Sequence, residues 1–277
     1  MIWQAWQKDY VQPDSTTVQG QTEPAEAQRK DMPGVPEATG GTAQPTDAPS
    51  VSAVKTAQRI NVRTDVYDIE MDSIGGDLRR VDLLAYPVEV DKPDQPFRLM
   101  DDGKNFFIAQ AALIPASGST APSHHQTFLA EKQNYQLSDG EDTLRVRLSW
   151  NNGEGVEVDK IYTFHRGSYV IDVDFEVKNN SGNPWSGHMY RQLQRSEPED
   201  GGSFFIHTYT GGVIYSAEKK YEKVDFDDMR KSNLSRSIDG GWAAMIQHYF
   251  LGAWTVSYTH LRAHETVLDL VCRLLLE

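Results

Sequence analysis

Two histidines near the carboxyl end of the sequence have a spacing that could bind a metal. In THLRAHETVLDLVCRLLLE, His260 and His264 are four residues apart, and Glu265 follows the second. Residues four apart share one face of a helix, which is how many zinc sites begin. A complete site needs further ligands, and the sequence has no Cys/His cluster with zinc spacing. We therefore expect no bound metal here.

The other histidines give little support for a site. The pair His124-His125 falls in ASGSTAPSHHQT, whose Ser, Pro and Gly content predicts a solvated loop. The remaining ones each occur singly in a strand pattern, where a histidine is more often a hydrogen-bonded rim residue than a ligand: His165, His188, His207 and His248.

Acidic residues are abundant, but their pattern does not indicate catalysis. Asp225, Asp227 and Asp228 alternate with basic residues in YEKVDFDDMRK, which is typical of a solvated face or a polar docking surface. A catalytic carboxylate needs burial and a raised pKa, and neither can be read from the sequence. There is also no phosphate-binding loop and no nucleophile elbow. We expect no catalytic residue and no cofactor, and we interpret the chain as a non-enzyme.

Aromatic residues concentrate between residues 215 and 254 and are the strongest binding signal. Most should belong to a core, yet Tyr and Trp are also enriched at interaction surfaces. The members are Tyr215, Tyr221, Phe226, Trp242, Tyr249, Phe250 and Trp254.

The segments that must position these residues are short strands. In LRVRLSWNNGEGVEVDKIYTFHR, apolar residues alternate from Leu144 to Trp150, and Asn152-Gly153 is a strong turn signal before Val156. SYVIDVDFEVKNNSG alternates in the same way, and Gly75-Gly76 gives a turn into DLRRVDLLAYP. Further strands are predicted in VRTDVYDIEM, HMYRQLQR, SFFIHTYTGGVIYS and GGWAAMIQHYFLGAW. VRTDVYDIEM changes its alternating phase midway, which indicates a bulge or two buried faces. No helical repeat is visible from Asn61 to Trp254, so the predicted class is all-β, a sandwich or a large curved double sheet.

Composition limits the partners and divides the chain. The net charge of −13 argues against nucleic acid or an anionic bilayer as the main partner, because both require a basic face. Cys272 is the single cysteine, so no disulfide framework exists, which suits the cytoplasm or a bacterial periplasm.

Residues 7–57 are rich in Pro, Thr and Gln and contain six of the 13 prolines, which predicts a disordered linker. MIWQAW, residues 1–6, is apolar but too short to span a bilayer.

Several ordered motifs together resemble one known family. After MIWQAW and the linker come VRTDVYDIEMDSIGGDLRRVDLLAYP, QPFRLM, FHRGSYVIDVDFEVKN, HTYTGGVIYS, EKKYEKVDFDD and GGWAAMIQHYFLGAW. This order resembles the N-terminal part of the YidC family of bacterial inner-membrane protein insertases, from Met1 to about Trp254.

The resemblance implies a domain organisation and a location. Residues 1–6 would be the periplasmic end of a first transmembrane helix that continues upstream of Met1. Residues 58–254 would be part of the large periplasmic domain, a β-supersandwich similar in fold to galactose mutarotases. The insertase activity would reside in a later membrane core that receives nascent inner-membrane proteins and is not matched here, so we expect no such activity from this chain alone.

The resemblance also implies partners. Part of the family's periplasmic domain contacts SecF of the SecD/SecF accessory complex of the Sec translocase, in the region of His207 to Trp254. The residues that we expect to bind the partner are Tyr215, Lys219, Tyr221, Phe226, Asp227, Trp242 and Tyr249. The alternative, suggested by fold analogy alone, is a sugar-binding or aldose-epimerase-like protein using His188 or His207 with a carboxylate.

The carboxyl-terminal segment 255–277 does not resemble the family. Its apolar spacing predicts an amphipathic helix from about Tyr258 to Leu276. SYTHLRAHETVLDLVCRLLLE looks instead like translated sequencing-adapter read-through, and we expect it to be foreign to the gene. Because the family continues with further strands after Trp254, we also expect uncovered sheet edges in this chain.

Overall fold

The computed structural model describes residues 55–115, 120–197, 209–231, 234–247, 249–263 and 272–275. All of them belong to one of the two units into which the chain divides, residues 33–277. The segment 1–6, nearly all of the predicted linker, His207, His248, His264 and Glu265 lie outside the described residues. Within the described part, no helix has the length and hydropathy needed to cross a bilayer.

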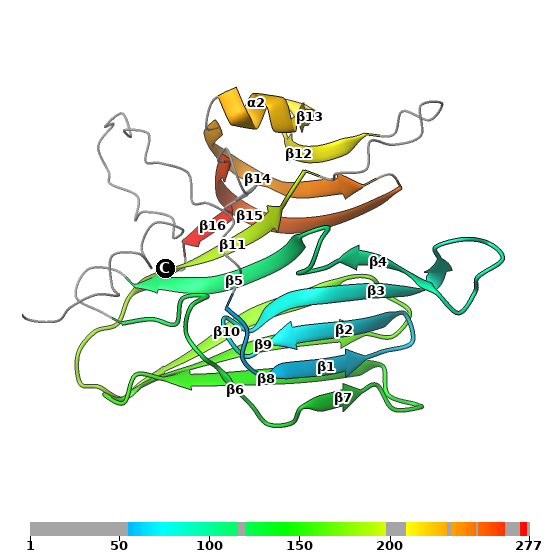
Figure 1. Cartoon of the computed structure of the whole chain (residues 1–277). Coiled ribbons are helices and arrows are strands. Elements are labelled where there is room, and N and C mark those ends of the chain that lie inside the picture. Colours follow the sequence, from blue (N-terminus) through cyan, green and yellow to red (C-terminus); the bar gives the residue numbers. More distant parts are fainter. Residues whose placement is uncertain are drawn as a thin grey trace, which may run out of the picture. The chain divides into compact units, whose positions relative to one another are not determined.

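The largest sheet has eight strands in the order β16-β11-β5-β3-β2-β1-β7, and β4 pairs with β3 (Figure 1). Its pairs are antiparallel except for β1 with β7. The strands are β1 (Arg59–Arg63), β2 (Tyr67–Asp72), β3 (Asp77–Pro87), β4 (Pro96–Met100), β5 (Phe107–Pro115), β7 (Asn134–Gln136), β11 (Gly187–Arg195) and β16 (Cys272–Leu275).

Two four-stranded antiparallel sheets complete the fold. The second sheet has the order β10-β9-β8-β6, and the third has the order β13-β12-β14-β15. The strands of the second sheet are β6 (Leu129–Ala130), β8 (Thr143–Asn151), β9 (Val156–His165) and β10 (Ile171–Asn179). Those of the third are β12 (Thr210–Ser216), β13 (Lys220–Val224), β14 (Leu234–Gln247) and β15 (Phe250–Ala263), and helix α2 (Phe226–Lys231) follows β13.

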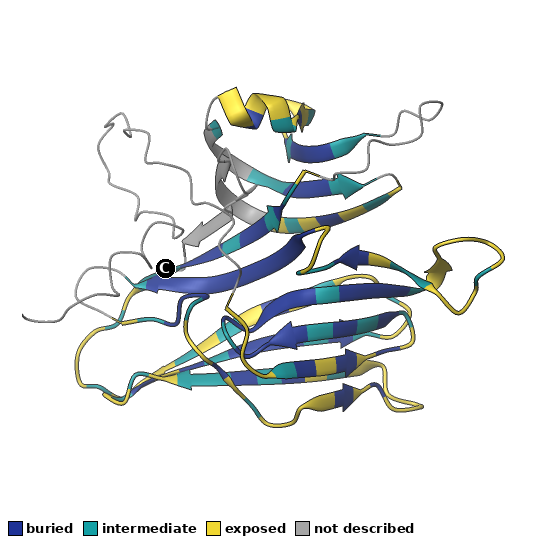
Figure 2. Cartoon of the chain, viewed as in Figure 1, coloured by how far each residue is buried: buried dark blue, intermediate teal, exposed yellow. Residues whose placement is uncertain are grey.

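One apolar core joins the three sheets. Alternating strands of the second sheet turn Val146, Leu148 and Phe164 toward the main sheet, where Ile69 and Met71 are fully buried. From the third sheet, buried Ile214, Ala243 and Met245 belong to the same core (Figure 2). Each of these Val, Leu, Ile, Phe and Met side chains contributes about 1.5–3 kcal/mol by its removal from water. The third sheet is therefore held by the same packing as the rest of the domain.

The all-β prediction is confirmed, and the best-patterned strands lie where the alternation placed them. The hairpin predicted around Asn152-Gly153 is β8 with β9, and Gly75 and Gly76, at φ 73° and 62°, turn β2 into β3. The phase change in VRTDVYDIEM separates two strands, because β1 ends at Arg63 and β2 begins at Tyr67.

The expected carboxyl-terminal helix was wrong. The residues described between Tyr258 and Leu276 form strand: β15 runs to Ala263 on β14, and β16 pairs with β11. Backbone pairing with the preceding strand β14 and with the distant strand β11 thus prevails over the helical spacing of the apolar residues. Conversely, the polar run after Val224 contains the short helix α2, with acidic residues in its first turn and basic residues in its last, an arrangement that favours the helix dipole.

A buried lysine connects the second sheet to the main sheet. Lys160 on β9 is fully buried, and its Nζ donates to the carbonyl oxygens of Gly75 (2.9 Å), Gly76 (3.0 Å) and Ala111 (2.6 Å). The hydroxyl of Tyr162 also donates to the Gly76 oxygen, at 2.6 Å. Burial lowers the pKa of Lys160 from 10.5 to about 8, partly opposed by the nearby Asp77 carboxylate.

We predict that Lys160→Met lowers the free energy of unfolding at pH 7 by about 2–4 kcal/mol, because three buried carbonyl groups each lose a hydrogen-bond donor. Urea denaturation of both proteins measures the difference. Lys178→Met, at an exposed lysine on the second sheet, is the control and should change stability by less than about 0.5 kcal/mol. Equal stabilities of the wild type and Lys160→Met would contradict the role of Lys160.

The pKa of Lys160 also predicts a pH dependence. Between pH 8 and 10.5, Lys160 keeps its proton in the unfolded chain but has lost it in the folded chain. The free energy of unfolding therefore rises with pH in this window. Relative to Lys160→Met, the wild type should gain on the order of 3 kcal/mol between these limits. Both proteins contain the other titrating groups, such as Tyr162, whose pKa is raised by burial. Their contributions to the pH dependence therefore cancel in this comparison. A pH-independent difference would refute the prediction.

Candidate functional site

Three of the predicted partner-binding residues come together across the third sheet. Tyr215 on β12 is paired with Tyr221 on β13 and with Trp242 on β14. The Tyr215 and Trp242 rings are stacked, with centroids 5.7 Å apart and planes at 5°, and Tyr221 meets Trp242 edge-on at 6.3 Å. Directly paired residues share one face of a sheet. We refer to these three residues as the aromatic row.

The aromatic row combines exposure with a rigid support. Tyr221 is 50% exposed and the other two rings are half-buried. Beneath them, Ile214 and Ala243 are buried in the common core, which holds β12 and β14 in place. Stacked aromatic rings on a fixed strand ladder bury much apolar area on association and lose little conformational entropy. This arrangement is suited to recognition of another protein.

Charged residues lie in the turn before Tyr221 and on α2. Lys219 is exposed in the turn between β12 and β13, where its backbone N–H donates to the Ser216 hydroxyl at 3.1 Å. Asp227 is exposed on α2 and contacts Arg230, which also reaches Glu197 at 2.5 Å. The solvated face predicted for this acidic and basic run is confirmed. Lys223 lies over the Tyr209 ring, 4.3 Å from its centroid, a cation–π contact that the sequence did not indicate.

Two of the predicted residues do not join the row. Phe226 is half-buried and packs against the common core. Tyr249 is 85% exposed, but it lies in the turn between β14 and β15. It is seven positions after Trp242 in the sequence, about 20 Å along an extended strand. Phe226 and Tyr249 lie in the same part of the sequence as the aromatic row, but they are not part of it in the structure.

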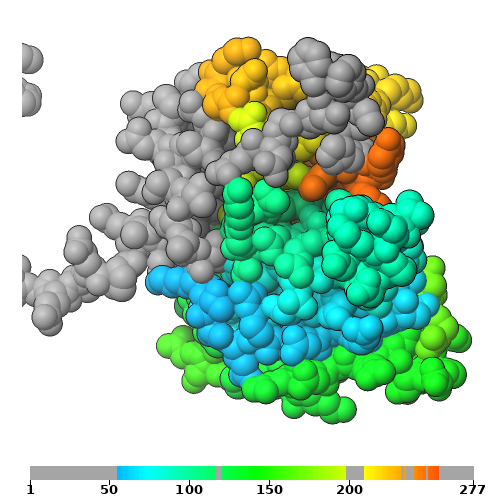
Figure 3. Space-filling view, turned by 45° about the vertical axis from the view of Figure 1, so that its right-hand side comes forward, coloured from blue at the N-terminus to red at the C-terminus, as the bar shows by residue number. Residues whose placement is uncertain are grey.

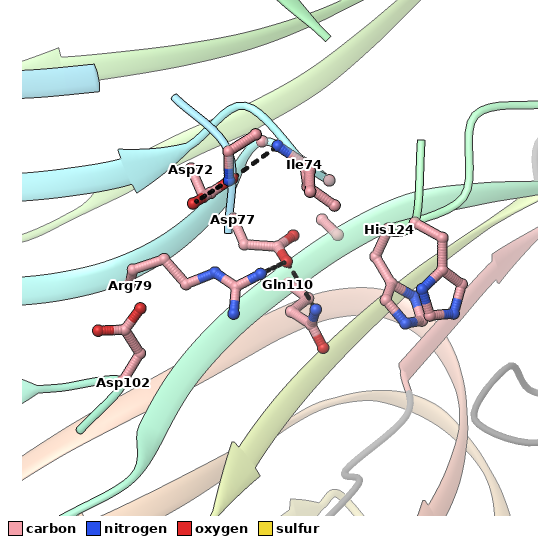
Figure 4. A network of polar contacts seen from close by, with 12 residues as sticks. Asp72, Ile74, Asp77, Arg79, Asp102, Gln110 and His124 are labelled. Carbon is pink, nitrogen blue, oxygen red and sulfur yellow. Dashed lines mark hydrogen bonds and ion pairs between the residues drawn. The ribbon is translucent and has the colours of Figure 1, made fainter. Parts of the chain in front are cut away.

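A buried polar network lies on the main sheet, at the turn between β2 and β3 (Figure 4). An Asp77 oxygen accepts from Arg79 at 3.1 Å and from Gln110 at 2.6 Å, and all three residues are at most 2% exposed. Asp72 accepts from the N–H groups of Ala57 and Ile74, at 3.1 and 2.8 Å. These contacts fix the start of β1 and the turn beside Lys160. The network explains local structure and presents no group to a substrate.

The histidines do not assemble a reaction centre in the described part of the chain. His124 was expected to be solvated, but it is buried against the Tyr190 hydroxyl, because its loop folds onto the main sheet. His165 contacts Asp172 at 2.7 Å at an exposed strand end, as a rim residue should. No hydrogen bond or ion pair joins His188 to a carboxylate, and no group of three His, Cys, Asp or Glu side chains could hold a metal among the described residues.

Sequence reasoning missed Lys160 and the hairpin residue Lys220. Lys160 occupies the inward phase of VEVDKIYTF, so the alternation itself carried the signal. Lys220 has φ 60°, a left-handed conformation that favours glycine, where β13 leaves its turn. It supports the position of Tyr221, the next residue in the row.

The fold is that of an all-β sandwich domain with a supported aromatic surface. The family model described as "YidC periplasmic domain" matches residues 59–267, and the chain belongs to this family. The match continues beyond Trp254, and the assignment of residues 255–277 to a foreign segment stays a prediction.

Curated relatives named membrane protein insertase YidC are similar over most of the chain. That of Methylococcus capsulatus is 45% identical over 258 residues, covering 91% of this chain and 46% of the relative. That of Thioalkalivibrio sulfidiphilus is 42% identical, covering 94% and 48%, and that of Alkalilimnicola ehrlichii is 48% identical, covering 73% and 36%. The chain thus spans about half, or less, of the length of these relatives. The crystal structure of Slr1438 protein from Synechocystis sp. PCC 6803 matches 82% of this chain and 89% of that one, with 10% sequence identity and a TM-score of 0.45. This structure is too distant to bear on the fold or function of this chain.

We predict that Lys220→Gly raises the free energy of unfolding by about 1 kcal/mol, because glycine adopts the left-handed conformation without strain. Thermal denaturation measures the change. Lys219→Gly is the matched control: its φ is not positive, so glycine there should leave stability unchanged or lower it. If Lys220→Gly destabilises as much as Lys219→Gly, the strain is absent.

Proposed function

We propose that this chain is the periplasmic domain of a bacterial inner-membrane protein insertase and serves as a non-catalytic interaction module. Its family, and relatives that carry the name membrane protein insertase, support this assignment. The domain faces the periplasm, and the activity on nascent inner-membrane proteins belongs to parts of the relatives that this chain does not match. The chain alone therefore has no insertase activity.

The partner in this proposal is the SecD/SecF complex of the Sec translocase, contacted through SecF. The observation that carries the proposal is the aromatic row, with half of the Tyr221 side chain accessible and both neighbouring rings supported by core strands. Exposed Lys219, in the turn before Tyr221, is a polar rim group, and Asp227 is exposed on α2. An aromatic centre with a charged rim is the usual anatomy of a protein interface.

We predict that Tyr215→Ala combined with Tyr221→Ala weakens binding to SecD/SecF at least about tenfold, because two central aromatic contacts are lost. Binding of the purified full chain to detergent-solubilised SecD/SecF, measured by biolayer interferometry, gives the two affinities.

The control is Tyr86→Ala, which removes an equally exposed tyrosine, 44% accessible, on β3. Circular dichroism spectra of the variants must match the wild type. Unchanged affinity in the double variant, or an equal loss in Tyr86→Ala, would show that the aromatic row is not the binding surface.

A further inference from the structure

The face of the third sheet that carries the aromatic row also carries a lysine. Lys223 follows Tyr221 by two positions on β13, and residues two apart on a strand project from the same face. Lys223 is paired with Val213, and Val213 with Ala244, and these pairs are two residues along the strands from those of the row. The Lys223 side chain is exposed. An exposed cation therefore lies beside Tyr221 on the face of the row.

The hairpin that leads to Tyr221 adds two further lysines. Lys219 and Lys220 are exposed where the chain turns from β12 into β13. In the described part of the chain, no ion pair engages the ammonium group of Lys219, Lys220 or Lys223. The Lys223 ammonium lies over the Tyr209 ring, 4.3 Å from its centroid, and a ring does not neutralise its charge. Three cations are thus available to a partner.

Most acidic residues of the same stretch do not oppose these cations. Glu222 alternates with Tyr221 and is opposite buried Ile214, so it lies on the other face of the sheet. The exposed carboxylates on α2 are paired with basic residues of the same helix. Glu218 and Asp225, on either side of β13, remain against the three lysines. The surface around Tyr221 is therefore net positive, in a chain whose net charge is −13.

The rings of the row offer positive edges and hydrogen-bond donors. Tyr215 and Trp242 are stacked, so each covers a face of the other and leaves ring edges, which carry partial positive charge, to a partner. Among the described residues, no hydrogen bond engages the hydroxyl of Tyr215 or of Tyr221, and each hydroxyl can donate one. Ring edges, hydroxyl donors and ammonium groups all favour an acceptor that carries negative charge.

From these observations we infer that the partner surface which meets the aromatic row is acidic. Asp or Glu side chains of the partner accept hydrogen bonds from the two tyrosine hydroxyls and pair with Lys219 and Lys223. The rest of a chain with net charge −13 repels such a surface, so the charges also select the orientation in which the partner docks. This inference rests on the proposed function and gives the chemical class of the partner surface at the same site.

The test measures binding of the full chain to detergent-solubilised SecD/SecF by biolayer interferometry at about 0.05 M and about 0.5 M NaCl. Lys219→Gln combined with Lys223→Gln should weaken binding about fivefold at the lower salt concentration, mainly through slower association, because rim charges steer the encounter. At the higher concentration the difference from the wild type should fall below about twofold. Glu218→Gln should act in the opposite direction and strengthen binding about twofold at the lower concentration.

The matched control removes the same charge elsewhere, by Lys132→Gln combined with Lys178→Gln. Both lysines are exposed, Lys178 on β10 and Lys132 shortly after β6. In Figure 3 the yellow and gold surface of β12, β13 and α2 is at the top of the domain, and the green surface that includes β6 and β8 is at the bottom. The control should change binding less than about twofold at either salt concentration. Circular dichroism spectra and melting temperatures of all variants must match the wild type.

The outcomes separate this inference from the proposed function. Equal effects of the two pairs of lysine substitutions, a loss of binding that does not diminish at the higher salt concentration, or no strengthening by Glu218→Gln would each overturn the inference. If Tyr215→Ala combined with Tyr221→Ala still weakens binding in that case, the proposed function stands. Absence of binding by the wild type, or no effect of the two tyrosine substitutions, would overturn the proposed function and the inference together.

Discussion

The burial of one ammonium group among backbone carbonyls is the constraint on which the rest of the domain depends. Lys160 joins β9 to the turn after β2 and to β5, because its Nζ reaches Gly75, Gly76 and Ala111. A fully buried cation is tolerated only where such donors and acceptors match. The second sheet consequently has one allowed position over the main sheet.

The turn at Gly75-Gly76 is equally restricted by its surroundings. A Cβ on Gly76 would lie 2.6 Å from a Leu148 methyl group, and a Cβ on Gly75 would lie 2.6 Å from an Asp77 oxygen. Both glycines also have positive φ. The turn therefore brings its carbonyls to Lys160, and Asp77 at the same time receives Arg79 and Gln110. Packing and hydrogen bonding here support the same geometry, which makes the main sheet a firm base for both smaller sheets.

The aromatic row depends on side chains paired across β12, β13 and β14, so its three rings share one face of the third sheet. The strands that carry Tyr215 and Trp242 also carry buried Ile214 and Ala243, which belong to the core shared by the three sheets. The surface proposed for a partner is therefore held in place by the same packing that holds the domain together.

The alternation of apolar residues by itself determined the all-β class, the hairpin of β8 and β9 and the strand β10, because a period of two is a local property of a half-buried strand. The sequence also concentrates Tyr215, Tyr221 and Trp242, with other aromatic residues, between positions 215 and 254. The tertiary structure alone decided that these three meet while Tyr249 lies apart, since strand register depends on partners distant in sequence. The same holds for the buried His124 and for the strand where a helix was expected after Tyr258. Each depends on which strands become neighbours, and neighbourhood is set by burial of the shared core and by backbone pairing, neither of which is encoded within one segment.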